Sequence, residues 1–513
     1  MNRANVGDHY GRERLKRALL HFITGRLVSG GLGIASLVLV IRHLPTQDFG
    51  LYAAMLSLQV VFLAYSSFGV EPAMERYLPE IRLTAAPGTL LRFMGVVLLL
   101  RLIFLGLSVV LLKVAVPLLA LYLGISDFDK ILDSYVWVIL AVALMNISGV
   151  ALEALLQQKA AQFSAVLYAA IRFALILYGV TQETLNIDEI VALDLYSALG
   201  AFSVSCIALL RYGMVDHKAC VSTSGAEKST IWLRFRPFAA KNFSAQIVMQ
   251  TYGPHALRLG VTSLSGLVET ARLGFAMGLS ELVQRYLPAT LLMRMIRPVF
   301  VSRYVANGDF QQLNAFANLV LKLNVLALAP LLAFVAVCGD TFSSLVSAGK
   351  YEDAHWILFG VVFLLFPLSH QIVVSILANT LEENDVQVKS ALVGLSGISV
   401  AYLFIPEFGA YGALLASVCS AIAYNLTTAT LLRRRGYKYK VDYRGLLKLF
   451  TASAASGFCA WATTFFFDGV IGLFLAGLTL LVVFVLVASR WKGFSREERN
   501  LINGMLPRNI FFF

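Results

Sequence analysis

Charged residues are scarce in this chain. Only 14% of its 513 residues are Asp, Glu, Lys or Arg, whereas 58% are hydrophobic. Soluble domains carry about 25% charged residues. The composition therefore excludes a soluble globular protein built from the whole chain, and it directs attention to the places where the few charges stand.

The sequence signatures of several enzyme classes are missing as well. There is no G-x-x-x-x-G-K-[ST] phosphate loop, no H-E-x-x-H and no complete G-x-S-x-G. The five cysteines lie far apart and form no C-x-x-C, so neither a metal knuckle nor a redox pair is indicated. We expect no enzymatic activity and no cofactor. If the protein moves a solute, the energy comes from an ion gradient, the membrane potential or the solute's own gradient.

The chain is rich instead in long apolar stretches. About 20 apolar residues suffice for one helix to cross a bilayer. The sequence predicts an all-α polytopic membrane protein with about fourteen transmembrane helices. The predicted spans are Leu19–Ile41, Gly50–Val70, Leu91–Leu112, Ser134–Leu155, Phe163–Val180, Ile190–Leu210, Phe243–Leu264, Leu273–Met293, Phe316–Cys338, Ala354–Ala378, Val386–Ile405, Ala410–Leu432, Leu446–Phe467 and Val470–Ala488.

The basic residues alternate between the two sides of these spans. If the N-terminus is cytoplasmic, about 31 Lys and Arg residues fall in inner segments, about 5 in outer segments and about 6 within spans. This is the asymmetry that the positive-inside rule describes. It accounts for the net charge of +12 without nucleic-acid binding, and it predicts that both termini are cytoplasmic.

A long hydrophilic stretch divides the chain. Residues 211–241 have the composition of a linker and separate two sets of six predicted spans. We expect a first six-helix lobe at 1–210, a cytoplasmic linker at 211–241, a second lobe at 242–432, and two further helices with a cytoplasmic tail at 433–513. Because each set has an even number of spans, both lobes enter the membrane from the same side and a site between them is feasible.

Several basic residues lie at membrane depth, where a cation costs at least about 2.5–3.5 kcal/mol. Each could be explained by a local ion pair, by a side chain that reaches the headgroups or by a misplaced span boundary. Few acids stand within the spans to neutralise them, chiefly Glu281 and Asp194. We therefore predict that they bind an anionic substrate headgroup. The candidates are Arg26, Arg101, Arg172, Arg258, Arg285 and Lys322.

Two of these cations, Arg101 and Arg172, lie near mid-membrane on spans that carry no acid of their own, so we expect both to face the cavity. Glu281 and Arg285 are spaced i, i+4 and can pair on one helix face. Glu281 is also a candidate ion-coupling residue. A histidine can titrate near neutral pH, so His370 is a second candidate for the same role, with a satisfied interior histidine as the alternative.

Three short motifs carry a resemblance to a known family. Residues 42–52 read RHLPTQDFGLY, residues 76–80 read RYLPE and residues 406–413 read PEFGAYGA. In this order they resemble the polysaccharide biosynthesis family of the MOP (MATE-like) exporter superfamily, the Wzx-type flippases. The first motif lacks the glycine that usually accompanies its proline.

The resemblance implies a MATE-like architecture with two six-helix lobes around a central cavity and two additional C-terminal helices. It implies translocation of polyprenyl-pyrophosphate-linked oligosaccharides across the bacterial inner membrane by alternating access. The product would be O-antigen, capsule or exopolysaccharide, with membrane lipids, a polymerase and chain-length proteins as partners. The alternatives are a lipid II flippase of the same superfamily, a MATE-type drug antiporter and a non-transporting scaffold of a polysaccharide synthase.

Overall fold

The computed structural model describes residues 12–74, 77–78, 87–125, 128–155, 157–217, 227–288, 290, 309–381, 383–505, 511 and 513. The described chain is almost entirely helical, and no β-strand occurs in it. It divides into two compact units, Met1–Gln250 and Thr251–Phe513. The predicted all-α class is confirmed.

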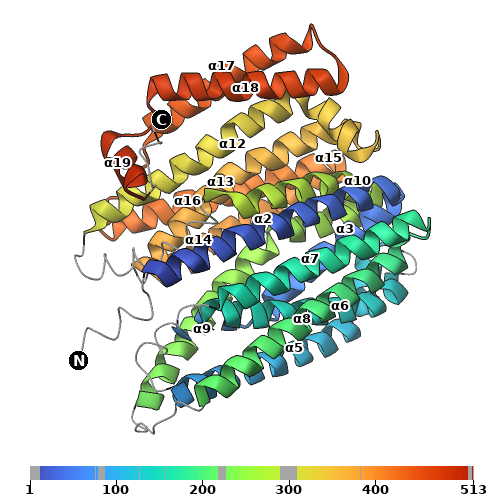
Figure 1. Ribbon diagram of the computed structural model, residues 1–513, viewed down its shortest axis with the longest axis vertical. Coiled ribbons are helices and arrows are strands. Elements are labelled where there is room, and N and C mark those ends of the chain that lie inside the picture. Colours follow the sequence, from blue (N-terminus) through green and yellow to red (C-terminus); the bar gives the residue numbers. More distant parts are fainter. Residues whose placement is uncertain are drawn as a thin grey trace. The chain divides into compact units, whose positions relative to one another are not determined.

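The first unit is a bundle of long helices. α2 packs against α7, while α6 and α7 both pack against α8, and α5 packs against α6 (Figure 1). Gly25 allows a close approach of α2 to α7, because a Cβ there would lie 2.6 Å from the Cβ of Gln162. The helices are α2 (Arg12–His43), α3 (Thr46–Tyr65), α5 (Pro87–Leu123), α6 (Phe128–Ala154), α7 (Gln158–Thr181), α8 (Ile187–His217) and α9 (Glu227–Thr251).

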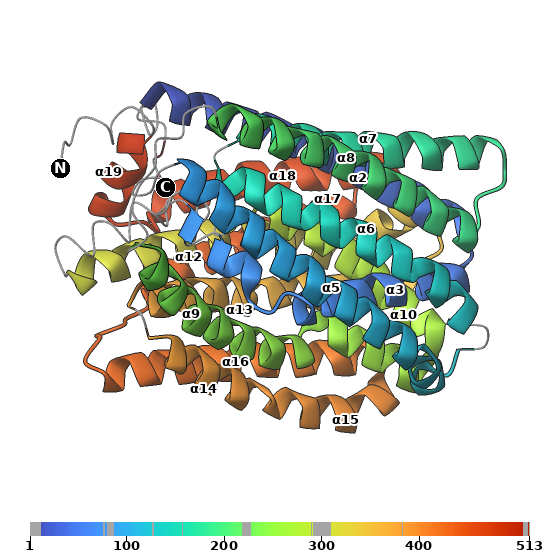
Figure 2. The same ribbon diagram turned by 90° about the horizontal axis from the view of Figure 1, so that it is seen from below.

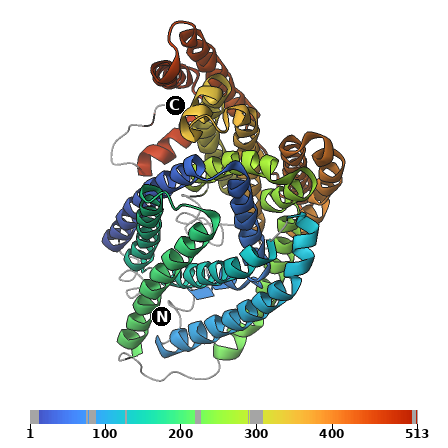
Figure 3. The same ribbon diagram turned by 90° about the vertical axis from the view of Figure 1, so that its right-hand side faces the viewer.

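The second unit contains the remaining helices. α14 and α15 follow one another beside α16 (Figure 2). α17 and α18, in red, form a pair at one edge of the unit and pack on α12 (Figure 3). The elements are α10 (Pro254–Tyr286), α12 (Phe310–Ser347), the short 3-10 helix η1 (Glu352–Ala354), α13 (His355–Thr380), α14 (Asn384–Gly394), α15 (Ser396–Phe408), α16 (Ala410–Arg434), α17 (Tyr443–Thr464), α18 (Gly469–Trp491) and α19 (Arg496–Met505).

The described part of every predicted span falls largely on helix; residues 289 and 291–293 of the eighth span lie outside the described residues. Among the described residues, 11 helical segments are long and apolar enough to cross a membrane, with α14 and α15 forming one of them. The other three predicted spans lie on α9, α10 and α17, which carry more polar residues. The hydrophilic stretch 211–241 is partly helical, since α8 continues to His217 and α9 begins at Glu227.

α10 is folded back on itself at Gly266, whose φ of 84° and ψ of −178° are not helical. The Oγ1 atoms of Thr262 and Thr270 are only 3.0 Å apart. In a straight helix, eight residues would separate them by about 12 Å. The two arms of this hairpin carry the end of the seventh predicted span and most of the eighth. The seventh span itself is interrupted at Tyr252 and Gly253, between α9 and α10.

The second predicted span ends earlier than expected. α3 stops at Tyr65, and a turn follows in which Phe68 and Gly69 have φ values of 47° and 70°. A side chain at Gly69 would collide with the carbonyl oxygen of Ala239 on α9. Hydropathy cannot reveal this break because the turn residues are themselves apolar or small.

Candidate functional site

A cavity of about 210 Å³ lies in the second unit among both arms of α10, α13 and α16. Its wall is mainly aliphatic. The polar groups that reach it are His255, Ser280, Glu281, Gln284 and Ser417. A largely apolar pocket with a few convergent polar groups is the usual form of a binding site.

Glu281 and His255 face each other across the α10 hairpin. The Nε2 atom of His255 lies 3.8 Å from Oε1 of Glu281, and the buried Nδ1 atom of His255 has no hydrogen-bond partner among the described residues. The hydroxyls of Ser280 and Ser417 donate to carbonyl oxygens of their own helices. The carboxylate and the imidazole are therefore the lining groups best able to bind a proton, a cation or a ligand amine.

Sequence reasoning identified Glu281 but missed His255. The two residues stand 26 positions apart, on the seventh and the eighth predicted spans, and hydropathy does not show which residues of two neighbouring spans face each other. The hairpin at Gly266 brings these two together. Two residues could have indicated this hairpin in the sequence: Gly266 at its turn and Pro254 at the start of α10.

The expected i, i+4 pair between Glu281 and Arg285 is not formed in the described structure. Arg285 is exposed, whereas the Glu281 carboxylate lies within 4 Å of the His255 imidazole. Arg258 is 2% exposed, and together with Arg285 it acts electrostatically on Glu281. The charges of α10 therefore gather around the hairpin and not along one helix face.

Arg101 meets an acid that the sequence argument did not count. Its Nε donates to Oε1 of Glu71 at 2.7 Å, and its Nη1 donates to the carbonyl oxygen of Ser66. The side chain is 1% exposed. Arg101 thereby satisfies a carbonyl oxygen left over where α3 ends, as well as neutralising Glu71.

Arg172 belongs to a closed network of three side chains. Its Nε donates to Oδ1 of Asp194 at 2.6 Å and its Nη2 donates to the hydroxyl of Tyr52 at 2.6 Å. That hydroxyl in turn donates to Oδ2 of Asp194 at 2.8 Å. The network joins α7, α8 and α3. No acid on the span of Arg172 could neutralise it, which suggested an unneutralised charge. The neutralising carboxylate, Asp194, comes from the neighbouring helix α8.

The other predicted residues are placed as follows. Lys322 is 1% exposed and lies between two carboxylates, Asp442 at 2.6 Å and Glu498 at 2.7 Å. His370 lies 2.8 Å, through Nε2, from the hydroxyl of Tyr439. Arg26 is partly buried on α2. Arg26, Arg101 and Arg172 belong to the first unit, whereas Arg258, Arg285 and Lys322 belong to the second.

Comparison by sequence yields no match to a family model or to a curated protein. Comparison by structure does. The lipid II flippase MurJ in an inward closed conformation has a TM-score of 0.69 at 15% identity, covering 94% of this chain and 99% of the flippase.

Two transporters show the same fold. An inward-facing multidrug resistance MATE family transporter of the MOP superfamily has a TM-score of 0.61 at 12% identity, covering 80% of this chain and 94% of the transporter. The MATE multidrug transporter DinF-BH has a TM-score of 0.57 at 15% identity, covering 84% of this chain and 98% of that transporter. This chain therefore has the multi-pass helical fold shared by the lipid II flippase and the MATE transporters of the MOP superfamily.

Proposed function

We propose that this protein translocates a polyprenyl-pyrophosphate-linked oligosaccharide across the bacterial inner membrane, by alternating access, for the synthesis of a cell-surface polysaccharide. The observation that carries the proposal is the likeness to the lipid II flippase, which extends over 94% of the chain. The likeness to the two MATE transporters extends over 80% and 84%. The short motifs near residues 42–52 and 406–413 support the oligosaccharide-lipid class.

The physical task is to carry a hydrated diphosphate through roughly 30 Å of hydrocarbon. Basic side chains are suited to hold it. We keep Arg26, Arg258 and Arg285 as candidate headgroup ligands. Arg101, Arg172 and Lys322 were candidates on sequence grounds, but their carboxylate partners within 3 Å favour a role in holding the fold.

Glu281 is the candidate coupling residue that the cavity supports. It opens into a mostly apolar space and has an imidazole within 4 Å, so uptake of a proton or a cation would change the charge around Arg258 and Arg285. His370 was the second candidate. Its hydrogen bond to Tyr439 favours the satisfied interior histidine.

One observation favours a second function, the export of small amphiphilic cations. An aliphatic cavity with a single carboxylate suits a ligand with an apolar body and a positive charge. A scaffold without transport activity is the third possibility, and lipid II as the cargo is a variant of the first.

Removal of the gene from its host separates these functions. Polymer, polyprenyl-linked oligosaccharide, lipid II and drug sensitivity are measured in the same cells. The proposal predicts loss of polymer and accumulation of the oligosaccharide lipid at the inner face. Accumulated lipid II would identify the other cargo. Loss of polymer without any accumulated lipid would indicate a scaffold, and drug sensitivity with normal polymer would indicate an antiporter.

A further inference from the structure

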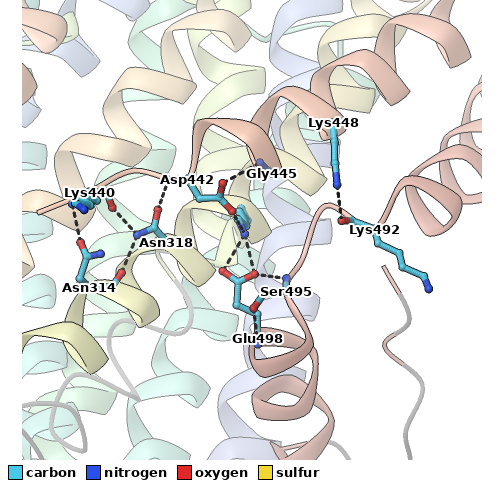
Figure 4. A network of polar contacts seen from close by, with 10 residues as sticks. Asn314, Asn318, Lys440, Asp442, Gly445, Lys448, Lys492, Ser495 and Glu498 are labelled. Carbon is cyan, nitrogen blue, oxygen red and sulfur yellow. Dashed lines mark hydrogen bonds and ion pairs between the residues drawn. The ribbon is translucent and has the colours of Figure 1, made fainter.

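A buried lysine joins α12 to the C-terminal part of the second unit. The Nζ atom of Lys322 lies 2.6 Å from Oδ2 of Asp442, 2.7 Å from Oε2 of Glu498 and 3.0 Å from its Oε1 (Figure 4). Asp442 directly precedes α17, and Glu498 lies on α19, just after α18. One ammonium group therefore contacts the residue that precedes α17 and a residue of the helix that follows α18.

Each carboxylate is fixed by the helix that carries it. Oδ1 of Asp442 accepts from the backbone N–H of Gly445 and caps the start of α17. Glu498 and Ser495 form a reciprocal capping box at α19, with Oε2 of Glu498 accepting from the Ser495 N–H at 2.7 Å and the Ser495 hydroxyl accepting from the Glu498 N–H at 3.2 Å. The two acids are thus oriented toward the lysine by local structure.

Gly445 makes room for the lysine. A Cβ at Gly445 would lie 2.6 Å from Cε of Lys322 and 2.6 Å from the carbonyl oxygen of Gly493. The start of α17 and the segment that follows α18 therefore cross in direct backbone contact beside the ammonium group. Burial by itself raises the pKa of Asp442, but the hydrogen bonds from Lys322 and Gly445 and the lysine charge bring this pKa below its usual value. Asp442 is consequently charged at neutral pH.

Further hydrogen bonds join α12 to the segment that precedes α17. Nδ2 of Asn318 donates to the carbonyl oxygen of Lys440, and Oδ1 of Asn318 accepts from the N–H of Asp442, both at 2.8 Å (Figure 4). Oδ1 of Asn314 accepts from the N–H of Lys440 at 3.2 Å. Farther along, Cys338 of α12 packs with buried residues of α17 and α18.

We propose that Lys322, Asp442 and Glu498 form a lock that stays closed throughout the transport cycle, so that α12, α17, α18 and α19 move as one body. Lys322 is then a positioning residue and not a headgroup ligand. Opening the lock would leave the buried ammonium group without a carboxylate and the buried Glu498 carboxylate without its cation, which opposes a gate at this place. The part of the proposal that concerns transport rests on the proposed function; the lock itself does not.

A distance measurement tests the lock without reference to transport. Spin labels are attached to cysteines at Gln311 on α12 and Asn500 on α19, both exposed, after the five native cysteines have been replaced. We expect one narrow distance distribution in the parent protein and a broadened one in Lys322→Met and Glu498→Gln. Lys448→Met is the matched control, because this nearby lysine is exposed and its hydrogen bond within the described chain is weak, with the Lys492 carbonyl oxygen at 3.5 Å. A distribution in Lys322→Met as narrow as in the parent would overturn the lock.

A cross-link tests whether the lock has to open. Cysteines at Asn314 and Lys440, which leave all three charged groups in place, are joined in purified protein, and flipping of a labelled polyprenyl-diphosphate oligosaccharide is measured in liposomes. We expect the cross-linked protein to retain the rate of the reduced protein. Loss of flipping upon cross-linking, with restoration by reductant, would contradict motion as one body. If the reduced protein fails to flip the lipid, the proposed function fails, while the distance measurement still decides on the lock.

Discussion

At the scale of single residues, Arg101 and Arg172 are each held by an acid that lies far from them in the sequence. Arg101→Ala would leave Glu71 without its cation, and within the described part of the chain the Oε2 atom of Glu71 already lacks a hydrogen-bond partner. Breaking a buried pair costs about 3–5 kcal/mol. We expect a corresponding loss of thermal stability in detergent and lower protein abundance, with partial recovery in the Arg101→Ala/Glu71→Ala double variant.

The control is Lys113→Ala, because Lys113 and Asp133 form an exposed pair at 2.9 Å. Such pairs contribute about 0–1 kcal/mol, so this variant should unfold close to the parent temperature. Normal abundance of Arg101→Ala combined with lost polymer export would contradict this structural role and would favour Arg101 as a headgroup ligand.

Glu281 gives a second prediction at this scale. Glu281→Gln keeps the size and polarity of the side chain but cannot carry a negative charge. We expect folded protein that no longer responds to an imposed ion gradient in liposomes, while Glu407→Gln, an exposed acid on α15, behaves as the parent does. A gradient response in Glu281→Gln equal to that of the parent would exclude this carboxylate as the coupling group.

The charged residues at membrane depth could be found from the sequence, but their partners could not. Asp194 and Glu71 are 22 and 30 positions from their arginines, and no periodicity relates them. Pairing depends on which helices touch, and that is decided by packing across the whole unit. His255 shows the same limit, since it becomes a neighbour of Glu281 only through a backbone reversal.

At the scale of helices, two glycines permit sharp turns of the backbone, Gly69 inside the second predicted span and Gly266 between the seventh and the eighth. Gly266 has a conformation that is essentially restricted to glycine, and Gly69 combines a positive φ with a clash at Ala239. Gly266→Ala should cost about 1–3 kcal/mol. Gly69→Ala should cost more, because strain and collision add.

Gly31→Ala is the matched control, as a Cβ there meets nothing within 4 Å on α2. An alanine inside a helix is favoured over glycine by about 1 kcal/mol, so this variant should be neutral or slightly stabilised. Unfolding temperatures of the three variants, measured in one detergent, give the order of their stabilities. Gly69→Ala as stable as Gly31→Ala would show that the turn after Tyr65 is not as described.

The positions of the helices were predictable because bilayer thickness fixes the length of an apolar segment. The breaks were not. α9 and α10 carry polar residues for their interior contacts, so hydropathy alone underestimates them, and the interruption at Tyr252–Gly253 lies inside a predicted span.

At the scale of the whole molecule, the structure preserves a likeness that sequence comparison does not detect. Lipid-facing positions need only be apolar, so a helical membrane fold tolerates extensive sequence change. The flippase likeness at 15% identity is consistent with this.

The orientation in the membrane is a prediction from the Lys/Arg alternation. Reporter fusions after Asp216 and after Lys440 should read as cytoplasmic, and a fusion at Thr184 should read as periplasmic. Residues 181–189 contain no lysine or arginine, whereas Arg433, Arg434 and Arg435 end α16 or follow it. A periplasmic signal at Lys440 would contradict the topology of the second half.

Flipping of a defined lipid by the purified protein is the most direct test of the central claim. Liposomes contain a labelled polyprenyl-diphosphate oligosaccharide on both faces, and an impermeant enzyme or quencher reports how much of it is accessible from outside. The proposed function predicts that nearly all of the label becomes accessible with the protein present, whereas about half stays protected in protein-free liposomes because a charged headgroup does not cross hydrocarbon unaided. Protection of the same half by folded, reconstituted protein, with and without an ion gradient, would contradict the account.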